Sequence, residues 1–281
     1  MKHFNEAAQF ILDNGVESED RTNTGTLSVF GLQMRFNLQE GFPAVTGKKL
    51  AWRAVKSELL WFLEGSTDER RLCEILHGSR DPALSTIWTL NANSSYWKPK
   101  AKFEGDLGHV YGYNWRFWED SRGVKHDQIA NLVHSLKNDP YGRRHILSGW
   151  NVGELDNTAL PACHSFAQFY VRNGKLSCQM YQRSADFFLG VPFNIASYSL
   201  LTHMLAQVCD LGVHEFVHVV GDAHIYKNHV DVMKLQLSRE LYPLPTLRIH
   251  TDNRDINKFT MDDFELENYS YHASIPAPMA V

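Results

Sequence analysis

Cys163 is the residue whose neighbours point most directly to chemistry. It stands in the run LPACH (160–164), just before an alternating stretch typical of a β-strand, and the runs QRSAD (182–186) and PFN (192–194) follow. An arginine, a serine, an acid and an amide after a cysteine suggest a thiolate that attacks an anionic substrate, because an arginine would both bind the anion and lower the pKa of the thiol. The alternative is a buried structural cysteine, the usual fate of a free cysteine.

Two other side chains bear on this cysteine. Successive residues of a strand point to opposite faces, so His164 should not form a dyad with Cys163, and activation falls to an arginine. Asn194 carries both a donor and an acceptor, which match the imide edge of a base such as uracil. Because Asn194 precedes an apolar helical stretch, a helix N-cap is its alternative role.

Three groups of arginines could bind a phosphate. Arg143 and Arg144 follow the turn signal NDP, Arg21 stands in the loop-like run DRTNTGT, and Arg183 is followed by Ser184. Each group alone is also compatible with a solvated surface patch. Together they suggest a substrate that carries a phosphate, since arginine offers paired donors to phosphate oxygens.

Glu58 is a candidate for acid–base chemistry. It lies in a predicted helix over residues 51–63, whose second half is apolar on nearly every side. A carboxylate at such a position would be buried, and burial raises its pKa. A helix acid held in a salt bridge fits the sequence equally well.

Four histidines lie close together near the end of the chain, but their spacing fits no standard metal site: His214, His218, His224 and His229. A zinc nucleotide deaminase would need H-x-E and P-C-x-x-C, and the run PACH has no second cysteine. No phosphate-binding loop of the type GxxxxGK[ST] occurs. We therefore expect no bound metal.

The elements that must position these residues follow from periodicity. Apolar residues at helical spacing predict helices over 4–12 (ended by Asn14-Gly15), 51–63 and 193–209. Alternation predicts strands over 32–38, 166–172, 175–182 and, shorter, 217–220. Asn173-Gly174 supplies the positive φ angles of a type I′ hairpin turn between two of them. We expect an insertion or small lobe at 73–105, loops after Pro243, and one α+β domain built on a sheet.

Composition excludes several classes of protein. The chain has 281 residues, 43% of them hydrophobic, and a formal net charge of −4, so nothing indicates binding to DNA or to a membrane. No apolar run has the length of a membrane span or of a signal core. Four cysteines without C-x-x-C spacing argue against a disulfide scaffold. The expected setting is the reducing cytoplasm, or the host cytoplasm if the protein is viral.

From residue 20 to residue 281 the chain resembles the thymidylate synthase family, which includes deoxyuridylate and deoxycytidylate hydroxymethylases. The resemblance is carried by GDLG (105–108), VYG (110–112), RR (143–144), WN (150–151), CH (163–164), YQRS (181–184), Asp186, LGVPFNIASY (189–198), GDAHIY (221–226) and APMAV (277–281). Segments of this length in this order make chance similarity implausible. The resemblance implies one catalytic domain over residues 1–281, with a large mixed β-sheet flanked by helices and a homodimer packed sheet against sheet. It also implies deoxyuridylate (dUMP) as substrate and 5,10-methylenetetrahydrofolate as co-substrate, with no metal.

The resemblance further implies roles for individual residues. Cys163 would add to C6 of the pyrimidine, Glu58 would organise water and protons, and Tyr111 would help to remove the C5 proton. The remaining substrate contacts would come from Arg21, Arg183 and Ser184 at the phosphate, Arg143 and Arg144 of the partner subunit, Gln182, Asn194 at uracil, and His224 and Tyr226 at the 3′-hydroxyl. The folate would meet Lys48, Trp88, Asp186 (also counted as catalytic) and the C-terminal segment ending in Val281.

The sequence departs from the usual family pattern beside these residues. His109 replaces the proline of the usual Leu-Gly-Pro, and Thr89 replaces the aspartate of the usual Trp-Asp. His109 lies two residues before Tyr111 and could position or deprotonate a water, which would favour a deoxyuridylate hydroxymethylase. The retained catalytic positions and tail would shield the intermediate from solvent and favour thymidylate synthase. A catalytically inactive nucleotide- or RNA-binding relative is a third alternative, against which the intact Cys163 and Asn194 argue.

Overall fold

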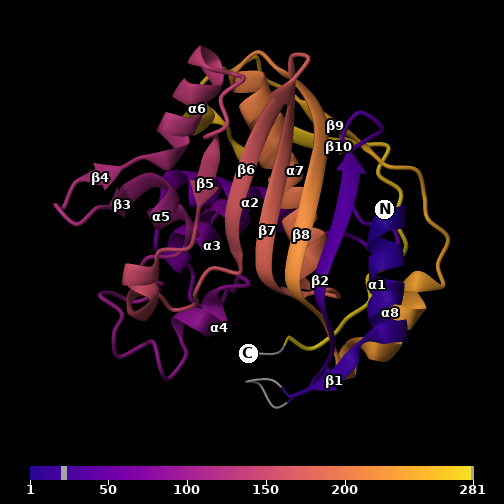
Figure 1. The fold of residues 1–281 in the computed structure, drawn as a ribbon. Coiled ribbons are helices and arrows are strands. Elements are labelled where there is room, and N and C mark those ends of the chain that lie inside the picture. Colours follow the sequence, from indigo (N-terminus) through magenta and orange to yellow (C-terminus); the bar gives the residue numbers. More distant parts are fainter. Residues whose placement is uncertain (20–23, 280–281) are drawn as a thin grey trace.

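The fold is built on one large mixed β-sheet. The computed structural model describes residues 1–19 and 24–279, and in this part of the chain six strands pair in the order β1-β2-β8-β7-β6-β5 (Figure 1). They are β1 (Val16–Ser18), β2 (Thr26–Asn37), β5 (Ile146–Ser148), β6 (His164–Arg172), β7 (Lys175–Asp186) and β8 (Gly212–Tyr226). Neighbours are antiparallel except β7 and β8, which run parallel. The predicted α+β domain with a large mixed sheet flanked by helices is confirmed.

A buried helix makes the parallel connection between β7 and β8. This helix, α7 (Gly190–Val208), packs against both strands and lies behind the sheet in Figure 1. A helix that is apolar on all sides is stable only inside a core. It begins at Gly190 rather than at the predicted residue 193, since a proline such as Pro192 is tolerated in the first turn.

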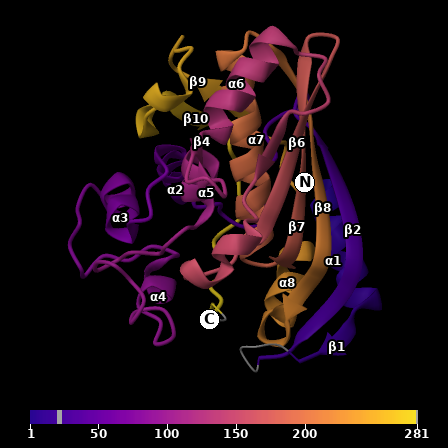
Figure 2. The same cartoon turned by 60° about the vertical axis from the view of Figure 1, so that its left-hand side comes forward.

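The other helices are α1 (Lys2–Asn14), α2 (Trp52–Glu64), α3 (Glu69–His77), α4 (Thr89–Ala92), α5 (Tyr111–Phe117), α6 (Gln128–Asn138) and α8 (Val230–Leu237). Figure 2 shows α2 to α7 on the same side of the sheet. The helices predicted over 4–12 and 51–63 are confirmed as α1 and α2, whereas α3, α4, α5, α6 and α8 were not predicted. No helix in the described ranges combines the length and the apolar character that a bilayer crossing requires.

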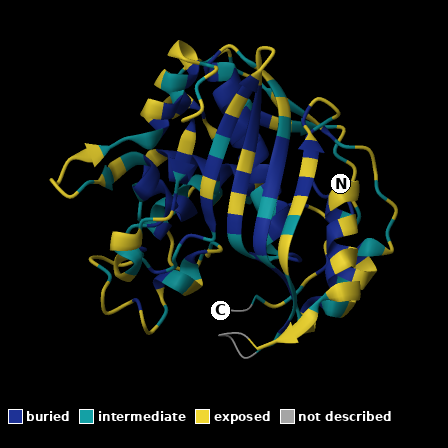
Figure 3. Ribbon diagram, viewed as in Figure 1, coloured by how far each residue is buried: buried dark blue, intermediate teal, exposed yellow. Residues whose placement is uncertain are grey.

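β6 and β7 form the predicted hairpin. Asn173 and Gly174 have φ angles of 52° and 70°, which confirms the type I′ turn. Exposed and more buried residues alternate along β6 and the middle of β7 (Figure 3). The face turned away from α7 carries Phe166, Tyr170 and Tyr181, which are 38%, 53% and 39% exposed. An open aromatic face of this kind is typical of a surface that another protein covers.

β8 is much longer than the strand predicted over 217–220. It has 15 residues and pairs with β2 on one side and with β7 on the other. Polar residues such as Asp222 and His224 interrupt its apolar pattern because they line a cavity rather than the core. The sequence pattern therefore revealed only the fully buried middle of the strand.

Short elements complete the chain: β3 (Trp118–Glu119), β4 (Lys125–His126), β9 (Thr246–Ile249), β10 (Phe264–Glu267), and the 3-10 turns η1 (Val152–Asn157), η2 (Lys227–His229), η3 (Ile256–Lys258) and η4 (Met261–Asp263). The region after Pro243 consists mostly of loops, as predicted, apart from the antiparallel pair of β9 and β10. The segment 73–105, expected as an insertion or small lobe, begins inside α3. Its residues Trp88, Ala92 and Trp97 are buried in the main core.

Candidate active site

A cavity of about 1120 Å³ lies between the ends of β2, β7 and β8 and the helices beside them. Eight of the residues singled out in the sequence line it: Glu58, Cys163, Arg183, Ser184, Asp186, Asn194, His224 and Tyr226. Although these residues range from position 58 to position 226, the sheet and the helices α2 and α7 bring them together around one cavity. Ile87, Leu160 and Phe193 add apolar surface. A cavity with apolar walls and a few convergent polar groups is typical of a small-molecule site.

Cys163 stands immediately before β6, where Arg183 of β7 reaches it. The Nη2 atom of Arg183 lies 3.6 Å from Sγ of Cys163, and Arg183 also donates to the carbonyl oxygens of Pro161 and Ala162 at 2.9 and 2.8 Å. Burial raises the pKa of Cys163, while the charge of Arg183 and the hydroxyl of Tyr111 oppose that rise. The predicted partnership of cysteine and arginine is present, but the thiol is largely protonated in the free protein. Its deprotonation must therefore accompany substrate binding or attack.

His164 does not contact Cys163 through a hydrogen bond but turns the other way, as the strand geometry predicts. Its Nδ1 atom lies 2.8 Å from the hydroxyl of Tyr198, and burial lowers the pKa of His164 to about 3, so the ring is neutral. Tyr111 stacks on the His164 ring at 3.7 Å, and its hydroxyl accepts a hydrogen bond of 2.7 Å from the backbone N–H of Cys163. His164 thus supports Tyr111, and Tyr111 fixes the backbone beneath the thiol.

The orientation of Asn194 is set by a chain of buried amides. Asn194 lies inside α7, five residues after Leu189, so the alternative N-cap role is wrong. Its Oδ1 atom accepts from Nε2 of Gln182 at 3.1 Å, and Oε1 of Gln182 lies 2.9 Å from Nε2 of His218. Burial lowers the pKa of His218 to about 3, and its Nδ1 atom has no partner among the described residues, which places the proton on Nε2. His218 therefore donates to Gln182, which donates to Asn194, and within the described part of the chain the N–H donors of Asn194 have no partner and can meet a ligand.

Asp222 organises the polar end of the cavity. Its carboxylate accepts from the hydroxyls of Ser28 and Ser184 at 2.8 and 3.1 Å, and Nδ1 of His224 lies 3.1 Å from it. Tyr226 meets the His224 ring edge to face at 5.1 Å. Sequence reasoning did not select Asp222, although it lies two residues before His224 and so on the same face of the strand. That spacing is the signal that could have revealed it.

The arginines predicted to bind phosphate are not all brought together within one chain. Arg183 lines the cavity, whereas Arg143 and Arg144 are exposed in the loop before β5 and do not line it. Arg21 lies outside the described residues, as does Val281. Among the described residues of one chain, Arg183 is therefore the only one of these arginines that lines the cavity.

Glu58 meets the indole of Trp88 at the helical side of the cavity. Nε1 of Trp88 donates to Oε1 of Glu58 at 2.7 Å, and the described residues include no ion-pair partner for Glu58. Burial raises the pKa of Glu58 to about 7, although the hydrogen bond from Trp88 opposes that rise. The structure favours the acid without a salt bridge, in a partly buried position at the cavity wall. Trp88 itself is only 5% exposed and is not among the residues that line the cavity.

This raised pKa predicts a pH-dependent stability cost. The pKa of Glu58 is about 7 in the folded protein and 4.5 in an ordinary setting, so the folded protein holds this proton more tightly than the unfolded chain does. The free energy of unfolding therefore falls by roughly 3 kcal/mol as the pH rises from 4.5 through 7. Glu58→Gln removes the titration and keeps an acceptor for Trp88. We expect its gain in thermal midpoint over the parent to be a few degrees larger at pH 8 than at pH 4.5, at equal protein concentration. Scanning calorimetry at the two pH values measures this difference, and an equal gain at both would contradict the assignment.

The far end of the cavity is formed by the start of α7 and the C-terminal tail. Oδ1 of Asp186 accepts from the backbone N–H groups of Phe188 and Leu189 at 2.9 and 3.1 Å. Lys48 donates to the carbonyl oxygen of Phe188, and burial lowers the pKa of Lys48 to about 8, opposed by the charge of Asp186. Nε2 of His229 lies 2.7 Å from the carbonyl oxygen of Pro278, which holds the tail so that Ala277 and Met279 line the cavity.

His109 lies apart from this arrangement. It pairs with Glu154 at 2.7 Å, stacks on Tyr113 at 3.8 Å, and does not line the cavity. The role expected for it, positioning a water beside the reacting groups, has no support in this geometry.

No three His, Cys, Asp or Glu side chains in the described ranges gather in a way that could hold a metal ion. All four cysteines, Cys73, Cys163, Cys178 and Cys209, are free. Cys163 is the one that reaches the cavity. A comparison with known families then gives one match that spans residues 2–281, to the family described as Thymidylate synthase.

Proposed function

This chain belongs to the thymidylate synthase family, since the match covers residues 2–281, and we propose that it catalyses the methyl-forming reaction. The family transfers a one-carbon unit from methylenetetrahydrofolate to C5 of a pyrimidine nucleotide. The proposed reaction converts dUMP to thymidylate and leaves dihydrofolate. One observation carries the proposal: the thiol of Cys163 lies 3.6 Å from Arg183, in a cavity whose wall also carries Asn194 and Asp186.

Cys163 supplies the electrons that C5 lacks. Its sulfur forms a bond to C6 of uracil, and the electron pair of the C5–C6 double bond moves to C5 and O4 as an enolate. The N–H donors of Asn194, fixed by Gln182 and His218, stabilise charge on O4. One free lone pair on Oδ1 of Asn194 can accept from N3–H of the base. An aspartate at this position would lack the donor and would favour cytosine.

Bound 5,10-methylenetetrahydrofolate would supply the one-carbon unit and, for the methyl product, the hydride. The residues present fit such a second ligand, because the cavity exceeds the space that one small ligand needs and one end combines apolar walls with the carboxylate of Asp186. The tail residues Ala277 and Met279 would hold it there. Lys48 and Trp88 do not line the cavity and would support the site from behind, through Phe188 and Glu58. Val281 is proposed as a further contact.

Glu58 and Tyr111 are suited to move protons. A carboxyl group with a pKa near 7 exchanges protons readily at neutral pH. Burial raises the pKa of Tyr111 well above its ordinary value, so its hydroxyl stays neutral and acts through hydrogen bonds. We assign to Tyr111 a hydrogen bond that positions a water, which takes the C5 proton, and to the carboxylate of Glu58 the acceptance of that proton from the water and the exchange of protons with O4.

A homodimer would complete the phosphate site. The open sheet face carries Phe166, Tyr170 and Tyr181, and Arg143 and Arg144 are exposed outside the cavity of their own chain. We propose that two sheets pack face to face and that Arg143 and Arg144 of each chain enter the other chain's cavity. There they would join Arg183, Ser184 and Arg21, while His224 and Tyr226 hold the 3′-hydroxyl.

The product distinguishes the methyl-forming reaction from its nearest alternative. Incubation with dUMP and methylenetetrahydrofolate should form thymidylate and dihydrofolate in equal amounts, measured by mass spectrometry and by absorbance. A product heavier than thymidylate by one oxygen, without dihydrofolate, would identify a deoxyuridylate hydroxymethylase instead. The apolar tail and the position of His109 away from the cavity favour the methyl product. Absence of both products would contradict the proposed function.

A further inference from the structure

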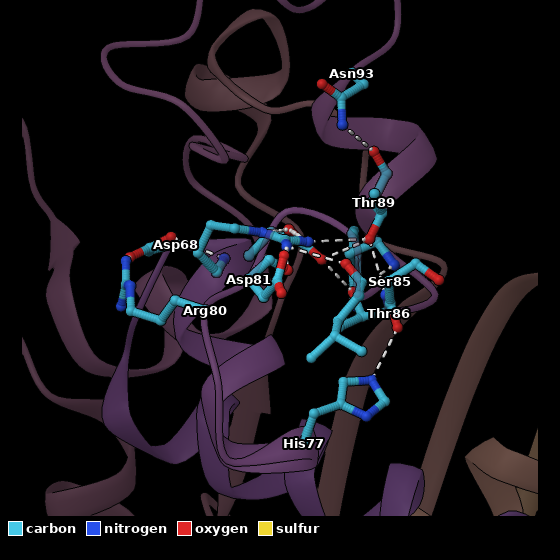
Figure 4. Close-up of polar contacts among 12 residues, drawn as sticks. Asp68, His77, Arg80, Asp81, Ser85, Thr86, Thr89 and Asn93 are labelled. Carbon is cyan, nitrogen blue, oxygen red and sulfur yellow. Dashed lines mark hydrogen bonds and ion pairs between the residues drawn. The ribbon is translucent and has the colours of Figure 1, made fainter.

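A buried carboxylate outside the cavity holds the segment that contacts Glu58. Glu69, in the first turn of α3, is 1% exposed. Its Oε1 atom accepts from the hydroxyls of Thr86 and Thr89 at 2.7 and 2.6 Å, and its Oε2 atom accepts from Nε of Arg70 at 2.6 Å. Figure 4 shows Thr86, in the loop before α4, and Thr89, the first residue of α4, beside this cluster. A buried charge with three charge-assisted hydrogen bonds fixes the groups around it tightly.

The same cluster ties a long loop to α3. Nη1 of Arg70 donates to the carbonyl oxygens of Asp81 and Leu84, each at 3.0 Å. The hydroxyl oxygen of Thr89 accepts from the backbone N–H of Thr86 at 2.8 Å. The loop is therefore anchored both through its backbone and through its two threonine hydroxyls.

Trp88 lies between the two threonines in the sequence and connects them to Glu58 at the cavity. Its backbone N–H donates to Oγ1 of Thr86 at 3.2 Å, while its indole N–H donates to Glu58 at 2.7 Å. The indole also packs against Trp61 and Phe62 of α2 and Tyr111 of α5. A displacement of the Thr86–Thr89 segment would therefore move the indole of Trp88 and disturb its hydrogen bond to Glu58.

We propose that Glu69 is a positioning residue for Glu58, acting through Thr86, Thr89 and the indole of Trp88. The proposal rests on the proposed function, in which Glu58 exchanges protons. It also gives a reason for the departure from the usual Trp-Asp. Thr89 stands where the family usually has an aspartate, and the carboxylate at this place is supplied by Glu69 of α3, which accepts from the hydroxyl of Thr89. Among the described residues, Tyr111 of α5 and Tyr198 of α7 interact electrostatically with Glu58, and burial raises the pKa of both, so they stay neutral.

Glu69→Gln is the first test, because glutamine keeps the size but has one acceptor oxygen in place of two and turns an N–H₂ group toward existing donors. The indole should lose its alignment with Glu58. Since that hydrogen bond lowers the pKa of Glu58, the inflection in the pH profile of kcat should move to higher pH. We expect kcat at pH 7 to fall between about tenfold and a hundredfold. The KM for dUMP should change less than about twofold, because the nucleotide contacts are untouched.

Two further variants separate positioning from loss of fold. Thr89→Val removes a single donor to Glu69 and should shift the profile in the same direction by less. Trp88→Phe removes the indole N–H that connects the loop to Glu58. Adding Glu69→Gln to Trp88→Phe should therefore cause no further shift of the inflection in the pH profile of kcat. Glu74→Gln is the matched control and should leave the profile unchanged. Glu74 is a partly exposed carboxylate on the same helix and pairs with Arg71 and Arg80.

The outcomes distinguish this inference from the proposed function. If the parent protein forms no methylated or hydroxymethylated nucleotide, the proposed function fails. If the parent turns over and Glu69→Gln and Thr89→Val leave its pH profile in place, the positioning role is overturned. It is also overturned if Glu69→Gln shifts the profile equally with and without Trp88, since the effect would then not pass through the indole.

Discussion

Cys163→Ser should lower kcat at least about a thousandfold while the protein still binds dUMP. A serine hydroxyl is far less acidic than a thiol, and Arg183, the described side chain that contacts this position, is a cation and not a base. Arg183 would remain bonded to the carbonyl oxygens of Pro161 and Ala162, so the anion site should persist. Steady-state turnover and isothermal titration with dUMP measure the two quantities separately.

The matched control for this change is Cys209→Ser. Cys209 is 8% exposed at the end of α7, burial raises its pKa to about 11, and it does not line the cavity. Its replacement should leave turnover within a few-fold of the parent. Turnover close to the parent value in Cys163→Ser would exclude covalent catalysis by this residue.

Two inactive variants should restore activity to each other if arginines enter the cavity from a partner chain. Arg144→Ala alone, or together with Arg143→Ala, should lower kcat/KM a hundredfold or more, since charge-assisted contacts to the phosphate are lost. Cys163→Ser is inactive for a different reason. In a mixed dimer, the chain with the intact cysteine receives intact arginines from the other chain, so one of its two sites is complete. Equal mixing after reversible dissociation should therefore recover about a quarter of the parent activity.

A parallel mixture tests whether the exchange is specific. Arg183 lies in the same chain's cavity as Cys163, so a dimer of Arg183→Ala with Cys163→Ser contains no complete site and should stay inactive. Recovery in the Arg144 mixture alone supports arginines in trans. No recovery in either mixture, despite demonstrated subunit exchange, would place Arg143 and Arg144 outside the site.

The parts of the fold that could be predicted are those with a local cause. The hairpin follows from Asn173-Gly174, which relieve the strain of positive φ angles, and α1 and α2 follow from apolar periodicity. The C-terminal end of β8 was missed because Asp222, His224 and Tyr226 line a cavity, so their residue types suit a ligand instead of the 2-residue alternation. Local rules fail where function selects the residue type.

The reacting groups of the candidate site could be predicted from the sequence, but the hydrogen bonds that orient them could not. Cysteine next to arginine was expected from residue types, and the 3.6 Å approach follows from the pairing of β6 with β7. The chain from His218 through Gln182 to Asn194 could not be predicted, because its members come from three elements that touch only in the folded core. Glu69 was missed for the same reason: its three donors include hydroxyls 17 and 20 residues away.

The most direct test is the mass of the protein after a quench with 5-fluorodeoxyuridylate and methylenetetrahydrofolate. Fluorine at C5 cannot leave as a proton does, so the chemistry should stop with the nucleotide and the folate both joined to the enzyme. The account predicts a mass increase equal to both ligands, mapped by peptide sequencing to Cys163 and absent from Cys163→Ser. An unmodified Cys163 in a preparation that turns over dUMP, or an adduct on another residue, would contradict it.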